Sequence, residues 1–197
     1  LIAVGMAFAI FVGEIDVSVG SNLGLVAAVV GTMIQNGSNW FAAFAVGICI
    51  GAVVGLINGW GVAVMKIPSL IFTLGTNGIL RGMMYLQVGA EQVNQLPKAF
   101  KDISSMTLVG SFTIYYCCAV LLTLLIHALL TRTRKGRYFI AVGDNAGGAE
   151  LVGIPATRTK VLAYVICGVL SAIGGIIFCS RIGIVTSLSG NGYEMKA

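Results

Sequence analysis

Long stretches of this chain carry no charged side chain. Residues 17–65, between Asp16 and Lys66, form one such run of 49 residues, and residues 103–131 form another of 29. A helix needs about 20 predominantly apolar residues to cross a bilayer core of about 30 Å. The longer run is therefore sufficient for two crossings, and its polar patch, residues 35–39, stands where a turn between them is expected. This charge pattern predicts a polytopic helical membrane protein.

The composition excludes an ordinary soluble domain. Charged residues make up 10% of the chain and hydrophobic residues 57%, whereas soluble domains carry about 25% charged residues. A soluble fold of 197 residues could not cover its surface with so few charges, so the lipid bilayer is an expected partner. The net charge of +5 does not indicate nucleic-acid binding, because the basic residues stand in connectors beside apolar runs, where membrane topology explains them.

The sequence holds no pattern typical of catalysis or metal binding. Its five cysteines lie in or at the ends of apolar runs, without a C-x-x-C pair or a histidine cluster, so we interpret them as apolar packing residues. The single histidine, His127, is likewise expected to be structural. No phosphate-binding G-x-x-x-x-G-K-[ST] loop and no nucleophile–base set is present. We therefore expect no enzymatic activity and no cofactor in this chain.

We predict an all-α transmembrane bundle in which residues 1–197 are part of a single transmembrane domain. The first apolar segment would be only about 18 Å long as a helix, and the chain neither begins with Met nor ends in a charged tail. We therefore expect the domain to continue beyond both ends. The six predicted membrane segments are Leu1–Val12, Val17–Ile34, Trp40–Met65, Ile67–Ala90, Ile114–Leu130 and Val161–Cys179.

The distribution of basic residues predicts the orientation of these segments. Six of the twelve lysines and arginines stand in the connector from Arg132 to Lys160. Cytoplasmic loops are enriched in Lys and Arg, so this connector is predicted to be cytoplasmic. Counting crossings from it places the Lys66 turn and Glu14–Gly20 inside, and Gln35–Asn39, Glu91–Gly110 and the residues after Arg181 outside.

The cytoplasmic connector contains the signals of a short helix. Asp144 or Asn145 is a suitable N-cap for a helix over Ala146–Val152, Gly153 is a suitable residue just past its end, and Pro155 prevents continuation. A helix of about two turns is marginal alone in water and needs a surface to pack against. The segment is thus either a docking helix for a soluble partner or an ordinary packed loop helix.

A glycine repeat and a set of intramembrane polar residues are the other informative patterns. Glycines at every fourth position form a smooth groove on one helix, which favours close helix packing or, alternatively, a sliding interface. Polar residues inside apolar segments usually face a bundle interior or a watery cavity and are candidates for a translocation pathway. The repeat is Gly47, Gly51, Gly55 and Gly59, and the polar residues are Asp16, Ser18, Asn22, Asn58, Asn77 and Arg81.

Two of these polar sites have a simpler interpretation. Asp16 or Ser18 can cap the helix that follows, and we favour this role over solute contact. Arg81 can extend its guanidinium toward the outer interface instead of lining a pathway. Because Gly78 and Gly82 flank Arg81, its helix is expected to be interrupted or packed tightly around the charge.

The ordered motifs resemble those of the ribose-type sugar permeases of ATP-binding-cassette (ABC) importers. The run Gly13–Gly20 is similar to the G-G-I-D-L-S-V-G signature of that family, with Glu14 where the family usually has glycine. Glu14 and the Gly-Asp-Asn form of the cytoplasmic connector are most similar to the autoinducer-2 and rhamnose-type branches. Further matching motifs are Lys66–Pro68, Thr73–Thr76, Arg81–Gly82, Gly136–Tyr138, Gly143–Asn145, Gly153–Ile154 and Gly192–Glu194.

The resemblance implies a membrane-spanning permease in a bacterial inner membrane that imports a sugar-like solute of the ribose, rhamnose or autoinducer-2 class. It implies three kinds of protein partner: ATP-binding subunits that dock on residues 132–160 and hydrolyse ATP, an extracytoplasmic solute-binding protein, and a second permease subunit, identical or different. The residues implied to form the coupling interface to the ATPase are Arg137, Gly143, Asp144, Asn145, Glu150 and Gly153.

Two other classes of protein remain compatible with the sequence. An ion-coupled secondary transporter would place its coupling site near the membrane midplane, where Arg81 is the only charged candidate. A scaffolding membrane protein would show no solute-dependent activity.

Overall fold

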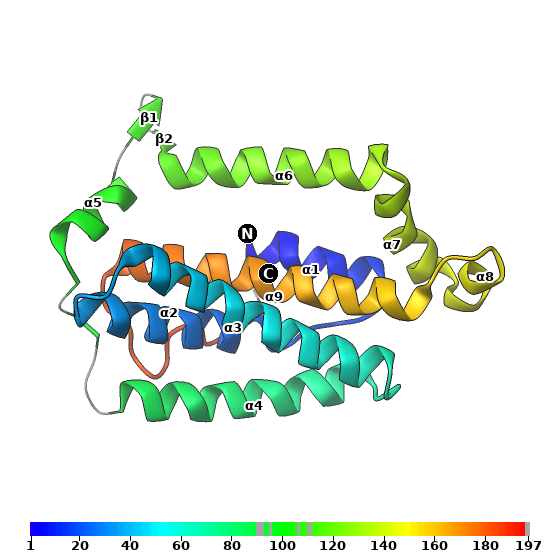
Figure 1. Ribbon diagram of the computed structural model, residues 1–197, viewed down its shortest axis with the longest axis horizontal. Coiled ribbons are helices and arrows are strands. Elements are labelled where there is room, and N and C mark those ends of the chain that lie inside the picture. Colours follow the sequence, from blue (N-terminus) through cyan, green and yellow to red (C-terminus); the bar gives the residue numbers. More distant parts are fainter. Residues whose placement is uncertain (90–92, 95, 106, 110–111, 196–197) are drawn as a thin grey trace.

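The protein is a bundle of long helices with a short helical extension at one end (Figure 1). A computed structural model describes residues 1–89, 93–94, 96–105, 107–109 and 112–195. The predicted all-α membrane bundle is confirmed, and a helix occupies each of the six predicted segments. These helices are α1 (Ile2–Phe11), α2 (Val19–Gln35), α3 (Trp40–Ala63), α4 (Ser69–Val88), α6 (Ile114–Arg132) and α9 (Ala156–Ile182).

The six helices differ in how well each could cross a membrane. Within the described residues, α3, α6 and α9 are long and apolar enough to do so, whereas α1 and α2 are shorter apolar helices. At 1.5 Å per residue, α1 covers about 15 Å and α2 about 25 Å. Some predicted boundaries lie outside the described residues. They are Ala90, the predicted end of the fourth membrane segment, and both ends of the predicted outer connector Glu91–Gly110.

The centre of the bundle is the contact between α3 and α9, where the glycine repeat lies. A Cβ atom added at Gly51 would lie 2.5 Å from the carbonyl oxygen of Gly168, and one added at Gly59 would lie 2.8 Å from the Cα of Val161. Real Cβ atoms essentially never approach so closely. The two backbones therefore touch directly, and Gly55 makes the same kind of contact with Tyr164.

The chain between α1 and α2 runs through the bundle without helical structure. Its backbone N–H groups find partners on α4, since Ile15 donates to the Ser69 hydroxyl (3.4 Å) and Val17 donates to the Thr73 hydroxyl (3.2 Å). Irregular backbone at membrane depth is tolerated where protein surrounds it. Asp16 and Ser18 were the two predicted caps of α2. Ser18 occupies the N-cap position, but its hydroxyl makes no cap hydrogen bond, whereas the Asp16 carboxylate accepts from the Ser18 N–H at 2.9 Å.

The short helix predicted over Ala146–Val152 is present as α8 (Ala146–Leu151). Asn145 is its N-cap and accepts a hydrogen bond from the backbone N–H of Gly148 at 2.9 Å, and Gly153 has a positive φ of 83° just past its end. A further helix that the sequence did not indicate, α7 (Arg134–Asp144), precedes it. The Thr133 hydroxyl caps α7 by accepting from the N–H of Gly136 at 2.9 Å.

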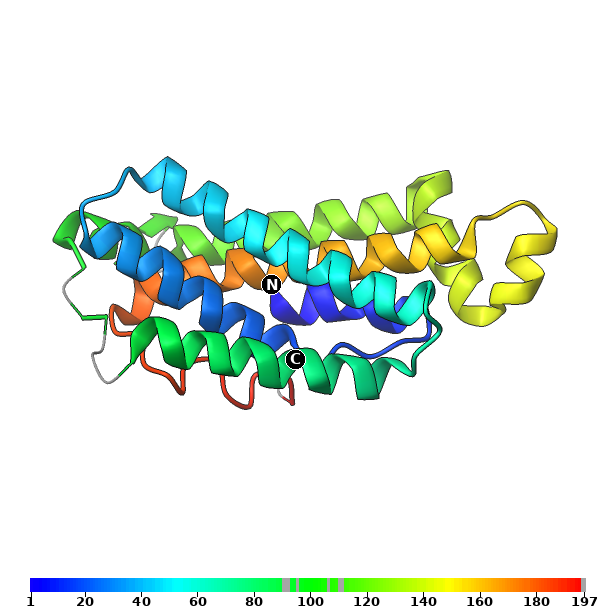
Figure 2. The same cartoon turned by 60° about the horizontal axis from the view of Figure 1, so that its bottom comes forward.

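The opposite end of the bundle also contains structure that was not predicted. The connector before α6 forms α5 (Lys98–Ser105) and a small antiparallel pair of strands, β1 (Thr107–Val109) and β2 (Phe112–Thr113). After α9, the chain turns back and packs along α2, where Gly190 lies against Gly20 (Figure 2). The residues after α9, for which only a position outside the membrane was predicted, therefore form a packed return segment.

The expectation of an interrupted or tightly packed helix around Arg81 is wrong. Helix α4 is continuous from Ser69 to Val88. Added Cβ atoms at Gly75, Gly78 and Gly82 would meet no atom within 4 Å, so these glycines form an open stripe on α4.

Candidate functional site

Four of the six predicted pathway residues meet in one buried network where α2 begins. The Ser18 hydroxyl donates to Asp16 Oδ1 at 2.6 Å, and the Asn58 side-chain amide donates to Ser18 Oγ at 2.8 Å and to the same Asp16 oxygen at 3.4 Å. The Asn22 amide donates to the carbonyl of Gly168 at 3.0 Å. These contacts join the irregular chain before α2 to both central helices, α3 and α9.

The Asp16 carboxyl is held by neutral donors only. It is 2% exposed, and no basic side chain in the described part of the chain lies within ion-pair distance of it. Asp16 Oδ1 also accepts from the backbone N–H of Ser18 at 2.9 Å. Two neighbouring acceptors, the amide oxygens of Asn22 and Asn58, are buried without a hydrogen-bond partner. A buried acceptor without a partner costs about 1–3 kcal/mol, so the network has unused hydrogen-bonding capacity.

The other two pathway candidates lie on α4 and make no described hydrogen bond to this network. Arg81 donates to the carbonyl of Ser189 at 3.2 Å and to the side-chain oxygen of Asn191 at 3.5 Å, so it anchors the return segment after α9. The amide oxygen of Asn77 is buried and unpartnered. The return segment also places the Glu194 carboxylate beside Gly20 at the start of α2, a residue that the sequence indicated only through a motif match.

The predicted coupling residues take three different positions around α7 and α8. Asn145 and Gly153 shape the ends of α8, and Arg137, Asp144 and Glu150 are exposed. Gly143 instead packs inward: an added Cβ atom would overlap the carbonyl oxygen of Phe11 at the end of α1. The nearby rings of Phe8 and Phe139 pack edge to face with their centroids 5.2 Å apart. Helix α7 is therefore fixed directly to α1.

The tip of the extension formed by α7 and α8 is apolar, which the sequence did not lead us to expect. Leu151 is 91% exposed and Val152 is 76% exposed, immediately after the last turn of α8. The buried side of α8 is supplied by Ala149, which packs in a cluster with Val142 and Ala156. The sequence did contain a signal for this apolar tip, because Leu151 and Val152 are adjacent aliphatic residues directly before Gly153, where a polar helix ends.

A charged cleft of about 350 Å³ lies between α8, the start of α9 and the turn that joins α3 to α4. Glu14 and Lys160 form an ion pair of 2.5 Å at its wall, and Lys66 and Glu150 line it as well. Lys66 has a φ of 57° and is the only non-glycine residue with a positive φ among those described. Strained backbone of this kind costs on the order of 1–3 kcal/mol and tends to occur at functional positions.

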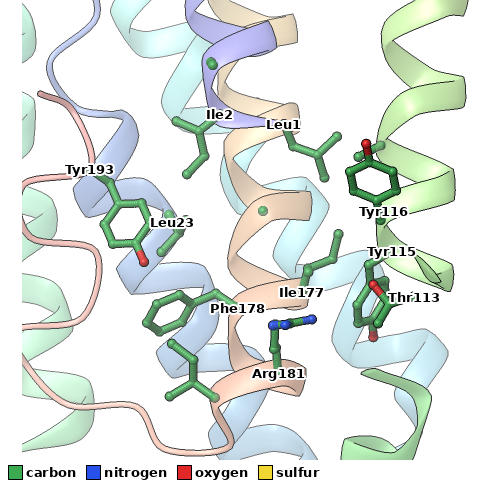
Figure 3. A pocket seen from close by; sticks show the side chains of 14 residues that line it. Leu1, Ile2, Leu23, Thr113, Tyr115, Tyr116, Ile177, Phe178, Arg181 and Tyr193 are labelled. Atoms are coloured by element: carbon green, nitrogen blue, oxygen red, sulfur yellow. The ribbon is translucent and has the colours of Figure 1, made fainter. Parts of the chain in front are cut away.

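A larger cavity lies elsewhere. It has a volume of about 750 Å³ and opens between α6 and the paired helices α1 and α9. Its lining is mostly apolar and includes Tyr115, Tyr116 and the charged Arg181 (Figure 3). No predicted pathway residue lines it. The polar network is a stronger candidate for a functional site than this cavity, because the cavity is mostly apolar and open along α6. Among the described side chains of α6, only Leu130 is buried.

Comparison with known proteins gives a consistent relationship over the whole chain. The profile of the family described as branched-chain amino acid transport system / permease component matches residues 1–197. The autoinducer 2 import system permease protein LsrC of Enterobacter sp. (strain 638) is 41% identical over 198 residues, which cover 100% of this chain and 57% of that protein. The LsrC proteins of Klebsiella pneumoniae subsp. pneumoniae (39% identical) and Salmonella typhimurium (38%) align over 100% of this chain and 57% and 56% of their own lengths.

The chain thus spans somewhat more than half the length of these curated relatives. No solved structure matches it. Because the family profile covers every residue and several long apolar helices are present, this chain belongs to the transport permease family described as branched-chain amino acid transport system / permease component, a family of multi-pass membrane proteins.

Proposed function

We propose that this chain forms part of the membrane-spanning permease subunit of an ATP-driven ABC importer in a bacterial inner membrane. The solute is a small sugar-like molecule of the autoinducer-2, ribose or rhamnose class, a proposal supported by the names of the relatives at about 40% identity. Residues 132–160 form the cytoplasmic coupling loop, and ATP is hydrolysed on separate partner subunits. An extracytoplasmic binding protein delivers the solute to the opposite end.

The exposed apolar tip of the extension is the observation that carries this proposal. Leu151 and Val152 project from a helix that is capped by Asn145 and fixed through α7 to the bundle. Fully burying an aliphatic side chain of this size contributes about 1.5–3 kcal/mol, so a matching apolar groove on a soluble partner would be favoured. A rigid attachment at one side and an apolar tip at the other suit an element that receives movement from the ATP-binding subunits.

The polar network and α4 support the assignment of a pathway. Asp16, Ser18, Asn22 and Asn58 hold the start of α2 between α3 and α9, so we propose that they set the shape of the pathway wall more than they touch solute. Asn77 and Arg81 lie on α4 and remain the candidates for solute contact. The open glycine stripe beside them would let the backbone of a second permease subunit, identical or different, approach closely.

Reconstitution tests the proposal. The full-length subunit is placed in proteoliposomes with its ATP-binding, permease and solute-binding partners, and ATP-dependent uptake and solute-stimulated ATPase activity are measured. The double variant Leu151→Asp/Val152→Asp should lower both at least tenfold and prevent co-purification of the ATP-binding subunit. The matched control Leu151→Met/Val152→Ile keeps the tip apolar and should retain both activities. Uptake driven by an ion gradient without ATP would show that the protein is a secondary transporter.

A further inference from the structure

The end of α1 and the irregular chain that follows it are held at two separate points, one on α7 and one on α9. The first is the backbone contact of Gly143 with Phe11, at the end of α1. The second is the ion pair between Glu14 and Lys160, which joins the next part of that chain to the second turn of α9. Glu14 lies only two residues before Asp16, so both contacts are adjacent to the buried network.

The Glu14–Lys160 pair is sheltered from solvent without being fully buried. The side chains are 16% and 22% exposed, respectively. Screening by water is reduced in such a position, so the pair is stronger than a surface ion pair but not as costly to open as a fully buried one. Gly13 precedes Glu14 with a φ of 78°, and a Cβ atom added there would lie 3.7 Å from the carbonyl oxygen of Gly143, in ordinary contact with α7.

A second carboxylate is available to Lys160 in the same cleft. Glu150 of α8 lines the cleft of about 350 Å³ together with Glu14 and Lys160, and it has no ion-pair partner among the described residues. Because Glu150 belongs to α8 and Glu14 to the chain before α2, the choice of partner by Lys160 depends on where α8 lies. A displacement of α8 across this cleft would bring Glu150 toward Lys160 and weaken the hold on Glu14.

We infer that Lys160 is a positioning residue that exchanges Glu14 for Glu150 during the transport cycle, and that this exchange passes movement of α8 to the start of α2. The inference rests on the proposed function and adds to it a specific connection between the docking tip and the Asp16 network. When Lys160 is paired with Glu14, the chain before Asp16 is held to α9. When Lys160 is paired with Glu150 instead, that chain is released and α8 is held to α9.

The test uses the same reconstituted full-length transporter and measures the number of ATP molecules hydrolysed per solute imported. Glu14→Gln and Lys160→Gln should each raise this ratio at least threefold, because ATP hydrolysis then continues without moving α2. The charge-exchanged variant Glu14→Lys/Lys160→Glu should return the ratio to within twofold of wild type. Glu150→Gln removes the second partner and should lower solute-stimulated ATPase activity. His127→Gln, a change of an exposed side chain on α6 outside residues 132–160, is the control and should leave the ratio unchanged.

The outcomes separate this inference from the proposed function. If wild-type protein shows ATP-dependent uptake but the Gln variants lose uptake and ATPase activity in equal proportion, the pair is only structural and the inference is wrong. It is equally wrong if the charge exchange fails to restore the ratio in protein whose membrane level and melting temperature match wild type. If wild-type protein shows no ATP-dependent uptake, the proposed function fails, and the exchange fails with it.

Discussion

The contact between α3 and α9 and the contact between α7 and α1 both depend on glycine, but they differ in what surrounds the glycine. Between α3 and α9, close backbone contacts recur at Gly51, Gly55 and Gly59 over successive turns of α3. Between α7 and α1, Gly143 makes one such contact, and the rest of the attachment consists of side chains such as Phe8 and Phe139. The first arrangement resists any change in spacing, whereas the second fixes one point and allows rotation around it.

The difference indicates a division of roles. The central helices α3 and α9 form a rigid unit, called the frame below, and the polar network attaches the start of α2 to that frame. The extension formed by α7 and α8 has few fixed points and an apolar end, and the proposed exchange of Lys160 between Glu14 and Glu150 would take place beside it. A transporter that converts movement of a soluble partner into movement of a pathway needs both kinds of region.

Substitution in the frame is expected to have the largest effect. Gly55→Leu would force a side chain into the carbonyl oxygen of Tyr164, and overpacking of this kind costs about 1–3 kcal/mol or more even where the backbone can shift. Because two backbones would have to separate, we expect loss of folded protein from the membrane or a fall in melting temperature above 10 °C. Thermal unfolding of the solubilised subunit measures this.

The matched control is Gly78→Leu on α4, where an added Cβ atom would meet no atom within 4 Å. It should leave the melting temperature of the isolated subunit within about 2 °C of wild type. Equal destabilisation by both substitutions would contradict the contrast between a packed and an open glycine stripe.

Loss of the Asp16 carboxyl is expected to have an intermediate effect. Asp16→Leu leaves the Ser18 N–H and the Ser18 hydroxyl without their acceptor, and each buried group left unsatisfied costs about 1–3 kcal/mol. The Asn58 amide loses its longer bond and keeps Ser18 Oγ as an acceptor. We expect a clear fall in melting temperature together with loss of uptake.

Asp16→Asn keeps an acceptor oxygen of the same shape and should retain most of the stability. If Asp16→Asn proved as destabilising as Asp16→Leu, a charge–charge interaction would be needed to explain the site, and the view that neutral donors hold this carboxyl would be wrong.

The parts of this molecule that the sequence predicts are those with local causes. The four-residue spacing from Gly47 to Gly59 indicated a packing face, and Asn145 and Gly153 indicated the ends of α8, because caps and periodicities act over a few residues. Helix α7 was missed because its basic residues indicated a loop. The Thr133 cap and the buried Phe139 that stabilise it are a weaker signal.

The contacts that join separate regions were not predictable in the same way. Glu14 and Lys160 are 146 residues apart, and Arg81 and Ser189 are 108 apart, so no pattern in the sequence connects them. The exposure of Leu151 was not predictable for a related reason. A sequence does not show whether an aliphatic residue packs in a core or faces outward, because that depends on which elements pack against it.

The smallest expected effect is local to the extension and distinguishes it from the frame. Asn145→Ala removes the acceptor for the Gly148 N–H and should cost about 1 kcal/mol of α8 stability. Because α8 has only six residues and is attached at its edges, this loss should appear as roughly fivefold faster amide hydrogen exchange in residues 146–151, with the melting temperature of the bundle unchanged. Asn145→Asp retains the acceptor and should leave exchange near wild type. A fall in melting temperature with Asn145→Ala would show that the extension and the frame unfold together, so that α8 could not move independently of α3 and α9.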